Sequence, residues 1–184
     1  MVNLLLVSAV IFNSVVMSLR EGIGEEHPFC DSGQNIFILL YIVVWIADSF
    51  WLNWSTFLMS STHWLLRGSI AFISIVLGVY LTQGAHKAVF DEAPSDPQVI
   101  DWGVFSFVRH PMYLGVLLIM MGLFFWSFSI ISIIIWVGFF FFYDRMASYE
   151  EEDLISIFGE DYAEYQRNVG KWFPVHAFKI KAHS

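Results

Sequence analysis

Apolar residues run along this chain in long blocks that short polar segments separate, a pattern typical of helices that cross a membrane. Three blocks have the length of about 20 residues that a helix needs to span the bilayer core, namely Met1–Leu19, Asn35–Leu52 and Trp64–Thr82. A fourth, Met112–Tyr143, carries no charge and is too long for one span, and Ser127–Ser129 offers a turn near its middle. The pattern therefore predicts an all-α integral membrane protein with about five transmembrane helices, or four if one is long and tilted.

The first block could be mistaken for a secretory signal peptide. No Lys or Arg precedes it, however, and Arg20 and the acidic EGIGEE follow it in place of a small-residue cleavage site. We therefore expect this block to be retained as the first span.

Composition supports a membrane protein and excludes several other classes. Of the 184 residues, 57% are hydrophobic and only 14% are charged, and the mean hydropathy is +0.62. The net charge of −8 argues against nucleic acid as a partner. The single cysteine, Cys30, excludes an internal disulfide framework, and the histidines lack metal-ligand spacing, so we predict no metal site.

The positive charges predict the orientation. With five spans and the C-terminus inside, only Arg67 of the nine Lys and Arg residues lies outside, an asymmetry that favours a cytoplasmic C-terminus. The inner residues are Arg20, Lys87, Arg109, Arg145, Arg167, Lys171, Lys179 and Lys181. We expect one membrane domain, 1–184, with three spans in 1–82, a core in 83–174 whose polar parts face the cytoplasm, and a tail in 175–184.

The segment VRHPMYLG places Arg109 and His110 at the start of the longest apolar block. Proline suits the first turn of a helix, so we expect a helix to begin at Pro111, with His110 extended before it. The free N–H groups of such a helix start attract anions, and Arg109 adds a bidentate donor beside them. Tyr113 adds a hydroxyl, and Gly115 leaves room for a ligand or a neighbouring helix. An ordinary interfacial anchor remains the alternative.

A second segment, 144–174, combines an acidic run with a helical apolar face. Apolar and aromatic residues recur there every three or four positions: Leu154, Phe158, Tyr162 and Tyr165. We expect Gly159 to interrupt the helix. The run Glu150–Asp153 fits a solvated face, or else one carboxylate points towards Pro111 and binds a cation, an ammonium group or ribose hydroxyls.

Together, the two segments resemble the isoprenylcysteine carboxyl methyltransferase family, whose members are integral membrane enzymes that use S-adenosylmethionine. The resemblance rests on VIDWGVFSFVRHPMYLG, a hydrophobic hairpin, EE..L...FG..Y..Y and a final proline, and it covers Pro97 to Pro174. The RHPxYxG element also occurs in phospholipid N-methyltransferases and, in a related form, in NADPH-dependent sterol reductases. Its combination with the second motif favours the carboxyl methyltransferases.

The resemblance implies the residues of a site. The cofactor-binding residues would be Gln98, Val99, Ile100, Phe105, His110, Pro111, Met112, Tyr113, Glu150 and Glu151. Phe105 replaces a tyrosine that is common in the family. The substrate-binding arginine of the family falls at Met146, so Arg145 is the candidate to replace it, and Arg109 is the second candidate catalytic residue.

The resemblance also implies a function. S-adenosylmethionine-dependent methyl transfer would take place in a catalytic core, 83–174, whose C-terminal helical segment completes a cytoplasmic cofactor pocket. A lipophilic acceptor, by default an isoprenylcysteine carboxylate, would enter from the bilayer. The alternatives are a phospholipid amine, a thiol, a sterol-reductase-like reaction with NADPH, or a membrane subunit without catalysis. The sequence leaves the oligomeric state open.

Overall fold

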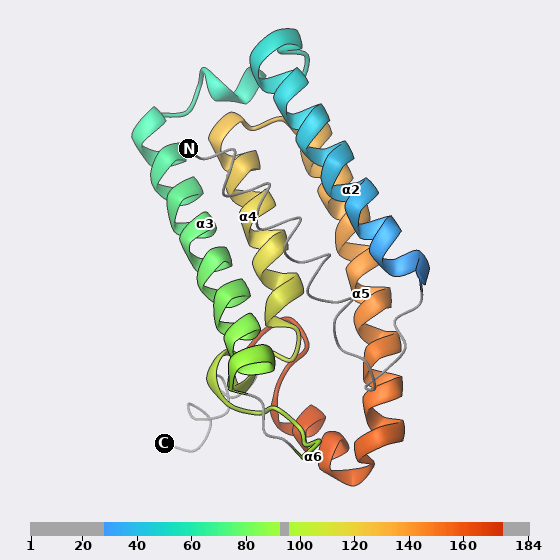
Figure 1. The fold of residues 1–184 in the computed structure, drawn as a ribbon. Helices are drawn as coiled ribbons and strands as arrows, with labels where there is room; N and C mark the ends of the chain where they lie inside the picture. The colour runs from blue at the N-terminus through green and yellow to red at the C-terminus, as the bar shows by residue number, and fades with distance from the viewer. Residues whose placement is uncertain (1–27, 93–95, 175–184) are drawn as a thin grey trace.

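The computed structural model describes residues 28–92 and 96–174, and these residues form a bundle of long helices without a strand (Figure 1). The helices are α2 (Pro28–Ile46), α3 (Trp64–His86), α4 (Pro111–Ser127), α5 (Ile130–Phe158) and α6 (Glu160–Asn168). Helices α2 and α3 continue through π-helical turns, Ala47–Leu52 and Lys87–Asp91, and short 3-10 turns cover Phe57–Met59 and Gly103–Ser106. The predicted first span and the tail 175–184 lie outside the described residues.

The predicted all-helical architecture is confirmed for the described residues. Three segments are long and apolar enough to cross a membrane: Gly33–Leu52, Trp64–Asp91 and Ile130–Phe158. Helix α4 is shorter, with 17 residues. The turn predicted at Ser127–Ser129 is also confirmed, because it separates α4 from α5.

Helix α5 extends beyond its apolar block. Helix α5 does not end where its apolar block ends at Tyr143 but continues to Phe158. Neither glycine nor proline occurs between these positions, and the polar residues there include good helix formers, so nothing stops the helix. It ends at Gly159, whose φ of 57° lies in the left-handed region, and α6 begins directly afterwards. Gly159 was predicted to interrupt the helix at this position.

Helices α3 and α4 pack closely because glycines lie at their contact. A Cβ atom on Gly78 would lie 2.5 Å from the carbonyl oxygen of Gly115, and one on Gly122 would lie 2.9 Å from the carbonyl oxygen of Ala71. Real Cβ atoms do not approach so closely, so these positions require glycine. Small residues at helix contacts are also what allows helices to associate within a membrane.

Helix α4 occupies the centre of the bundle and is bound through its backbone. Five of its carbonyl oxygens accept hydrogen bonds of 2.5 to 2.8 Å from side chains of the other helices. The donors are Tyr41 and Trp45 from α2, Arg67 and Ser74 from α3, and Trp136 from α5. These bonds fix α4 relative to all three neighbours, and so they fix the residues at its start.

A buried carboxylate ties together the two turns at one end of the bundle. Asp48, which is 1% exposed, accepts hydrogen bonds from the backbone N–H groups of Trp54 and Ser55. It also accepts from the hydroxyls of Ser55 and Ser129. The turn after α2 is thereby held against the turn between α4 and α5.

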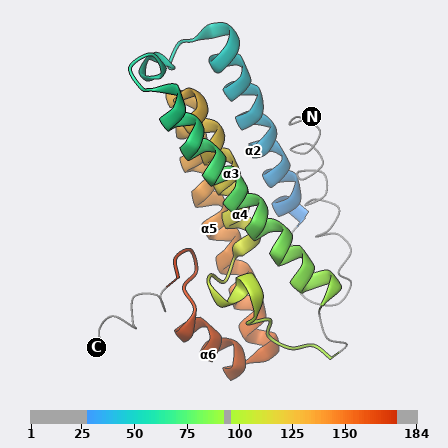
Figure 2. The ribbon, with the colours of Figure 1, turned by 90° about the vertical axis from the view of Figure 1, so that its left-hand side faces the viewer.

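The other end of the bundle collects the polar segments that carry the predicted site. The start of α4, the end of α5 and the whole of α6 lie there in both views (Figures 1 and 2). The sequence motifs around Pro111 and Glu150, far apart in the chain, therefore meet at one end of the molecule.

Candidate active site

The start of α4 has the local structure that its sequence predicts. Pro111 is the first helical residue, and His110 precedes it with φ −120° and ψ 62°, outside the helical region. The backbone N–H of Arg109 donates to the carbonyl oxygen of Gly170 at 3.0 Å, and Val108 forms a bridge with the same residue. The segment that follows α6 is thereby held beside the start of α4.

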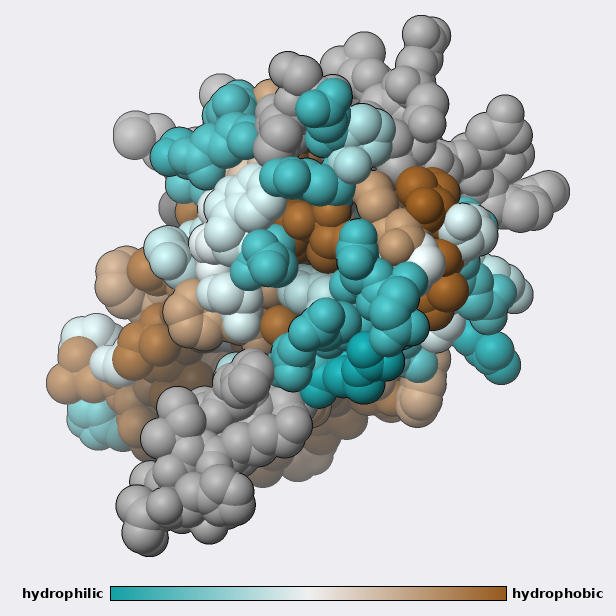
Figure 3. Space-filling view, turned by 90° about the horizontal axis from the view of Figure 1, so that it is seen from below, coloured by the Kyte–Doolittle hydropathy of each residue, from teal (hydrophilic) through white to brown (hydrophobic). Residues whose placement is uncertain are grey.

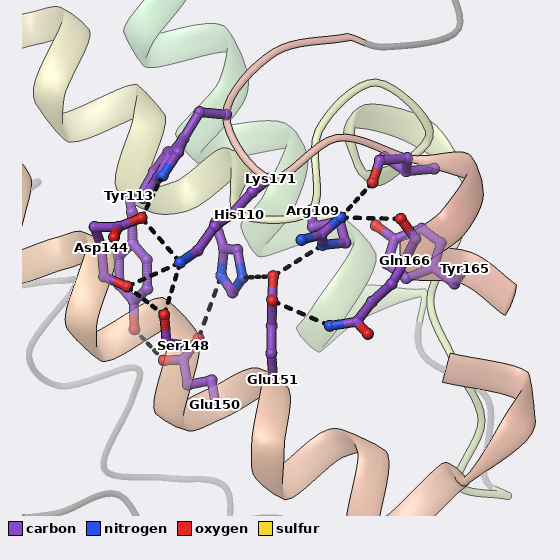
Figure 4. A network of polar contacts seen from close by, with 12 residues as sticks. Arg109, His110, Tyr113, Asp144, Ser148, Glu150, Glu151, Tyr165, Gln166 and Lys171 are labelled. Atoms are coloured by element: carbon purple, nitrogen blue, oxygen red, sulfur yellow. Dashed lines mark hydrogen bonds and ion pairs between the residues drawn. The ribbon is translucent and has the colours of Figure 1, made fainter. Parts of the chain in front are cut away.

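Glu150 faces two residues at the start of α4 (Figure 4). The hydroxyl of Tyr113 donates to its Oε1 atom, and Nδ1 of His110 lies 3.4 Å from its Oε2 atom. The rings of His110 and Tyr113 are stacked, with centroids 5.7 Å apart and planes 5° apart. The Glu150 side chain is 33% exposed, so its carboxylate can still be reached from outside the protein.

Glu151, in contrast, is enclosed by protein partners. Its Oε1 atom lies 2.8 Å from Nε of Arg109 and 2.9 Å from Nε2 of His110, and its Oε2 atom accepts from Nε2 of Gln166 at 3.0 Å. The side chains of Arg109 and Glu151 are each only 12% exposed. The geometry gives Glu151 the place of a structural partner, whereas Glu150 is the accessible carboxylate.

Arg109 joins three parts of the chain. In addition to Glu151 on α5, it donates to the carbonyl oxygens of Gln166 on α6 at 3.1 Å and of Val169 after α6 at 2.5 Å. The catalytic role implied for Arg109 stays a prediction. The contacts that the structure shows are those of a clamp that fixes α6 beside the start of α4.

His110 lies between the two carboxylates. Burial opposes its protonation, but hydrogen bonds and charge from Glu150 and Glu151 outweigh burial and raise the pKa of His110 above its ordinary value. Both ring nitrogens face carboxylate oxygens, and a histidine can donate from both nitrogens only when it is protonated. The structure therefore favours an imidazolium that neutralises one of the two acids.

A second polar contact, which sequence reasoning missed, fixes the segment after α6 against α5. The ammonium group of Lys171 donates to the backbone and side-chain oxygens of Asp144 and to the hydroxyl of Ser148, each at 2.9 Å. The indole of Trp172 also donates to Asp144 and lies 6.0 Å from the ring of His110. The signal in the sequence was the pair Lys171 and Trp172, two side chains with hydrogen-bond donors directly after the helix.

The other predicted cofactor residues surround this cluster without joining its hydrogen bonds. Phe105 and Met112 pack against a small core of Leu81, Ala85 and Val104, on the side of α3. The backbone of Phe105 is fixed, since its carbonyl oxygen accepts from the hydroxyl of Tyr165.

The remaining predicted residues differ in exposure. Val99 packs against the aromatic cluster of α6, Ile100 is half-buried and Gln98 is exposed. Arg145 is also exposed and forms no ion pair with a described residue, while Met146 beside it is buried in the core. The structure thus does not bring Arg145 to the cluster, and its role as a replacement for the substrate arginine stays a prediction.

The surface over this end is markedly polar. Hydrophilic side chains gather there around a hydrophobic centre (Figure 3). Among residues 28–92 and 96–174, no group of three or more His, Cys, Asp or Glu side chains could hold a metal ion. What the end offers is one accessible carboxylate, a histidine between two carboxylates and aromatic rings at a helix start.

The known proteins to which this chain is similar are methyltransferases. A family model described as phospholipid methyltransferase matches residues 68–161, a range that includes the start of α4 and both glutamates. The methanethiol S-methyltransferase of Pseudomonas deceptionensis is 30% identical over 71% of this chain and 49% of its own length. Two protein-S-isoprenylcysteine O-methyltransferases are also similar. That of Tribolium castaneum is 30% identical over 66% of this chain and 46% of its own length. That of Dictyostelium discoideum is 29% identical over 74% of this chain and 58% of its own length.

This chain therefore spans about half the length of the relatives that it matches. The family match covers half of the chain and lies over the residues that converge at the start of α4. On these grounds the chain belongs to the phospholipid methyltransferase family, in which it is similar to both isoprenylcysteine and thiol methyltransferases.

Proposed function

We propose that this protein transfers a methyl group from S-adenosylmethionine to a lipophilic acceptor at the membrane. The observation that carries the proposal is the accessible carboxylate of Glu150, held by His110 and Tyr113 at the helix start of an otherwise apolar bundle. Members of the matching family are methyltransferases, and such a site is suited to a cationic, nucleoside-containing methyl donor.

The hydrogen-bonding capacity of the site fits this donor. Each carboxylate oxygen can accept two hydrogen bonds, and each oxygen of Glu150 uses one with His110 or Tyr113. Two acceptor positions remain for an ammonium group or for ribose hydroxyls. The first N–H groups of α4 have no partner within the helix, and they suit the carboxylate of the donor. Gln98, Val99, Ile100, Phe105 and Met112 would complete the donor site.

The chain's contribution to the reaction is positioning and exclusion of water. When bound, S-adenosylmethionine supplies a methyl group that its sulfonium already activates for in-line displacement. The clamp of Arg109 and Glu151 holds α6 over the start of α4, and the rings of His110, Tyr113 and Trp172 exclude water there. A carboxylate acceptor needs no general base, because it is ionised at neutral pH.

The acceptor is expected to arrive from the bilayer. Large apolar side chains on α2, α3 and α5 point away from the bundle, where lipid would surround them: Ile36, Leu39, Phe72, Ile73, Ile134 and Phe141. An isoprenylcysteine carboxylate is the acceptor we favour, given the similarity to two enzymes of that name. A thiol is the second candidate, because the Pseudomonas relative is a thiol methyltransferase by name.

The proposal includes the topology expected from the sequence. Helices α2 to α5 and the preceding apolar block would give five spans, with the C-terminus and the donor site in the cytoplasm. Helix α4, at about 1.5 Å per residue, is near 25 Å long. It is slightly shorter than the bilayer core, and its three neighbours would shield its ends.

Calorimetric titration with S-adenosylhomocysteine tests the donor site. Glu150→Gln should weaken binding about tenfold or more, because it removes a charged hydrogen-bond acceptor. Glu152→Gln is the matched control, since Glu152 is an exposed neighbour and should leave the affinity unchanged. If the Glu150→Gln variant bound S-adenosylhomocysteine as tightly as the Glu152→Gln variant, the donor site would not lie at Glu150. Transfer of a labelled methyl group to a farnesylcysteine, phosphatidylethanolamine or a thiol then identifies the acceptor.

A further inference from the structure

Among the described residues, three buried side-chain atoms have no hydrogen-bond partner: Nε of Arg67, the hydroxyl of Tyr143 on α5 and the amide nitrogen Nε2 of Gln34 on α2. The guanidinium of Arg67 is still bound through Nη1, which donates to the carbonyl oxygen of Trp126. Tyr143 is 0% exposed and Gln34 is 1% exposed, so water does not solvate them from outside. A buried donor without a partner is unfavourable and rare in folded proteins, so each of these groups needs an explanation.

Tyr143 lies directly behind the donor site. Its ring stacks on that of Tyr113, with centroids 4.5 Å apart, and the hydroxyl of Tyr113 donates to Glu150. Tyr143 also precedes Glu150 by two helical turns, so both residues lie on the same face of α5. The unpaired hydroxyl is therefore close to the reacting centre but farther from the polar end of the bundle than Glu150.

Gln34 faces the same core from α2. Ile38, one turn later on the same face, belongs with Tyr143 to a single buried cluster. The two helices touch at this level, because a Cβ atom on Gly33 would lie 2.8 Å from Cζ of Phe142. The residue before Gln34 thus contacts the residue before Tyr143, which places the two unpaired groups at the same level of the bundle.

The chemistry of the two groups selects a ligand. The amide nitrogen of Gln34 only donates hydrogen bonds, and the phenolic hydroxyl of Tyr143 is a stronger donor than acceptor. Neutral donors in an apolar interior stabilise an anion, as in an oxyanion hole. An ammonium head group would bring further hydrogen-bond donors to Tyr143 and Gln34, which are themselves donors without an acceptor.

We propose that Tyr143 and Gln34 form an acceptor subsite that binds the anionic head group, a carboxylate or a thiolate, of the lipophilic methyl acceptor. The subsite lies on the bilayer side of Glu150, between α2 and α5. The inference rests on the proposed function and specifies the acceptor class for it. On this inference, the amine of a phospholipid is not the methyl acceptor that the subsite binds.

The test removes each unpaired group while keeping the shape of the side chain. Tyr143→Phe and Gln34→Leu should leave the unfolding temperature unchanged or raise it, because neither group has a partner to lose. In contrast, the KM for S-farnesyl-N-acetylcysteine should rise about tenfold in each variant, with the affinity for S-adenosylhomocysteine unchanged. Tyr149→Phe, an exposed position on the same helix, is the matched control and should change none of these values.

A binding experiment separates this inference from the proposed function. Tryptophan fluorescence of the full chain in detergent measures the binding of S-farnesyl-N-acetylcysteine and of its neutral methyl ester without turnover. The wild-type protein should prefer the carboxylate, and both variants should lose that preference. Absence of S-adenosylhomocysteine binding in the wild type would reject the proposed function alone. An unchanged preference in both variants, or a loss of S-adenosylhomocysteine binding in either, would overturn the subsite.

Discussion

Replacement of Arg109 by methionine tests whether this residue is a structural clamp. The change keeps an apolar stem but removes three hydrogen bonds, one to the carboxylate of Glu151 and two to the carbonyl oxygens of Gln166 and Val169. It also leaves Glu151 without its arginine partner while 12% exposed. Loss of one member of a buried ion pair costs about 3–5 kcal/mol. We therefore expect that loss in the free energy of unfolding, or a decrease of about 10 °C in the unfolding temperature.

The assay is thermal unfolding in detergent together with limited proteolysis, which should first cleave at α6. Arg167→Met is the control, because the ion pair of Arg167 with Glu160 is exposed and should be worth about 1 kcal/mol or less. Combined with Glu151→Gln, the Arg109 change should show a coupling energy of about 0.5–3 kcal/mol. A loss no larger than that of the Arg167 variant, with no coupling, would refute the clamp and leave a direct catalytic role for Arg109.

Further outcomes are expected at the α3–α4 contact, at His110 and at the two turns that Asp48 holds together. Gly115→Ala should destabilise the fold by about 1–3 kcal/mol in chemical unfolding, because its Cβ atom would lie 2.7 Å from the carbonyl oxygen of Gly78. Gly138→Ala is the control and should not destabilise the fold, because its Cβ atom would lie 3.9 Å from the nearest side chain. The pKa of His110 is raised on folding, so its stabilising effect is full below the ordinary value of about 6.5 and is lost as pH rises through the raised pKa. The unfolding temperature should accordingly fall as pH rises above about 6.5, and it should fall less in His110→Gln. Asp48→Asn should cost about 1.5–3 kcal/mol in the same unfolding assay, because an amide cannot accept all four hydrogen bonds of the carboxylate.

Local features of the fold could be predicted from the sequence because local chemistry determines them. Pro111 fixes φ and lacks an N–H group, so it begins a helix wherever the following residues allow one. Gly159 ends α5 because it adopts a positive φ without strain. The helical spacing of Tyr162 and Tyr165 placed both on one face, and the structure buries both in one cluster with Val169.

Features that depend on contacts between distant elements could not be predicted in this way. Periodicity shows which face of a helix is apolar, but it does not show which helix covers that face. The acidic run therefore gave no basis for separating the accessible Glu150 from the enclosed Glu151, since that difference depends on Arg109, 42 residues away. The contact of Lys171 with Asp144 and the lack of a partner for Tyr143 likewise depend on how α5 packs against the rest of the chain.

The way in which α4 is held affects which of its side chains can be exchanged. Its neighbours bind backbone carbonyl oxygens, and every residue type presents the same carbonyl. The outward side chains of α4 are therefore free to drift among apolar residues, whereas Tyr41, Trp45 and Trp136 must keep their donors. A saturation mutagenesis scan should find apolar exchange tolerated at the half-buried positions of α4, and little tolerance at its glycines and at buried positions such as Leu117 and Met120.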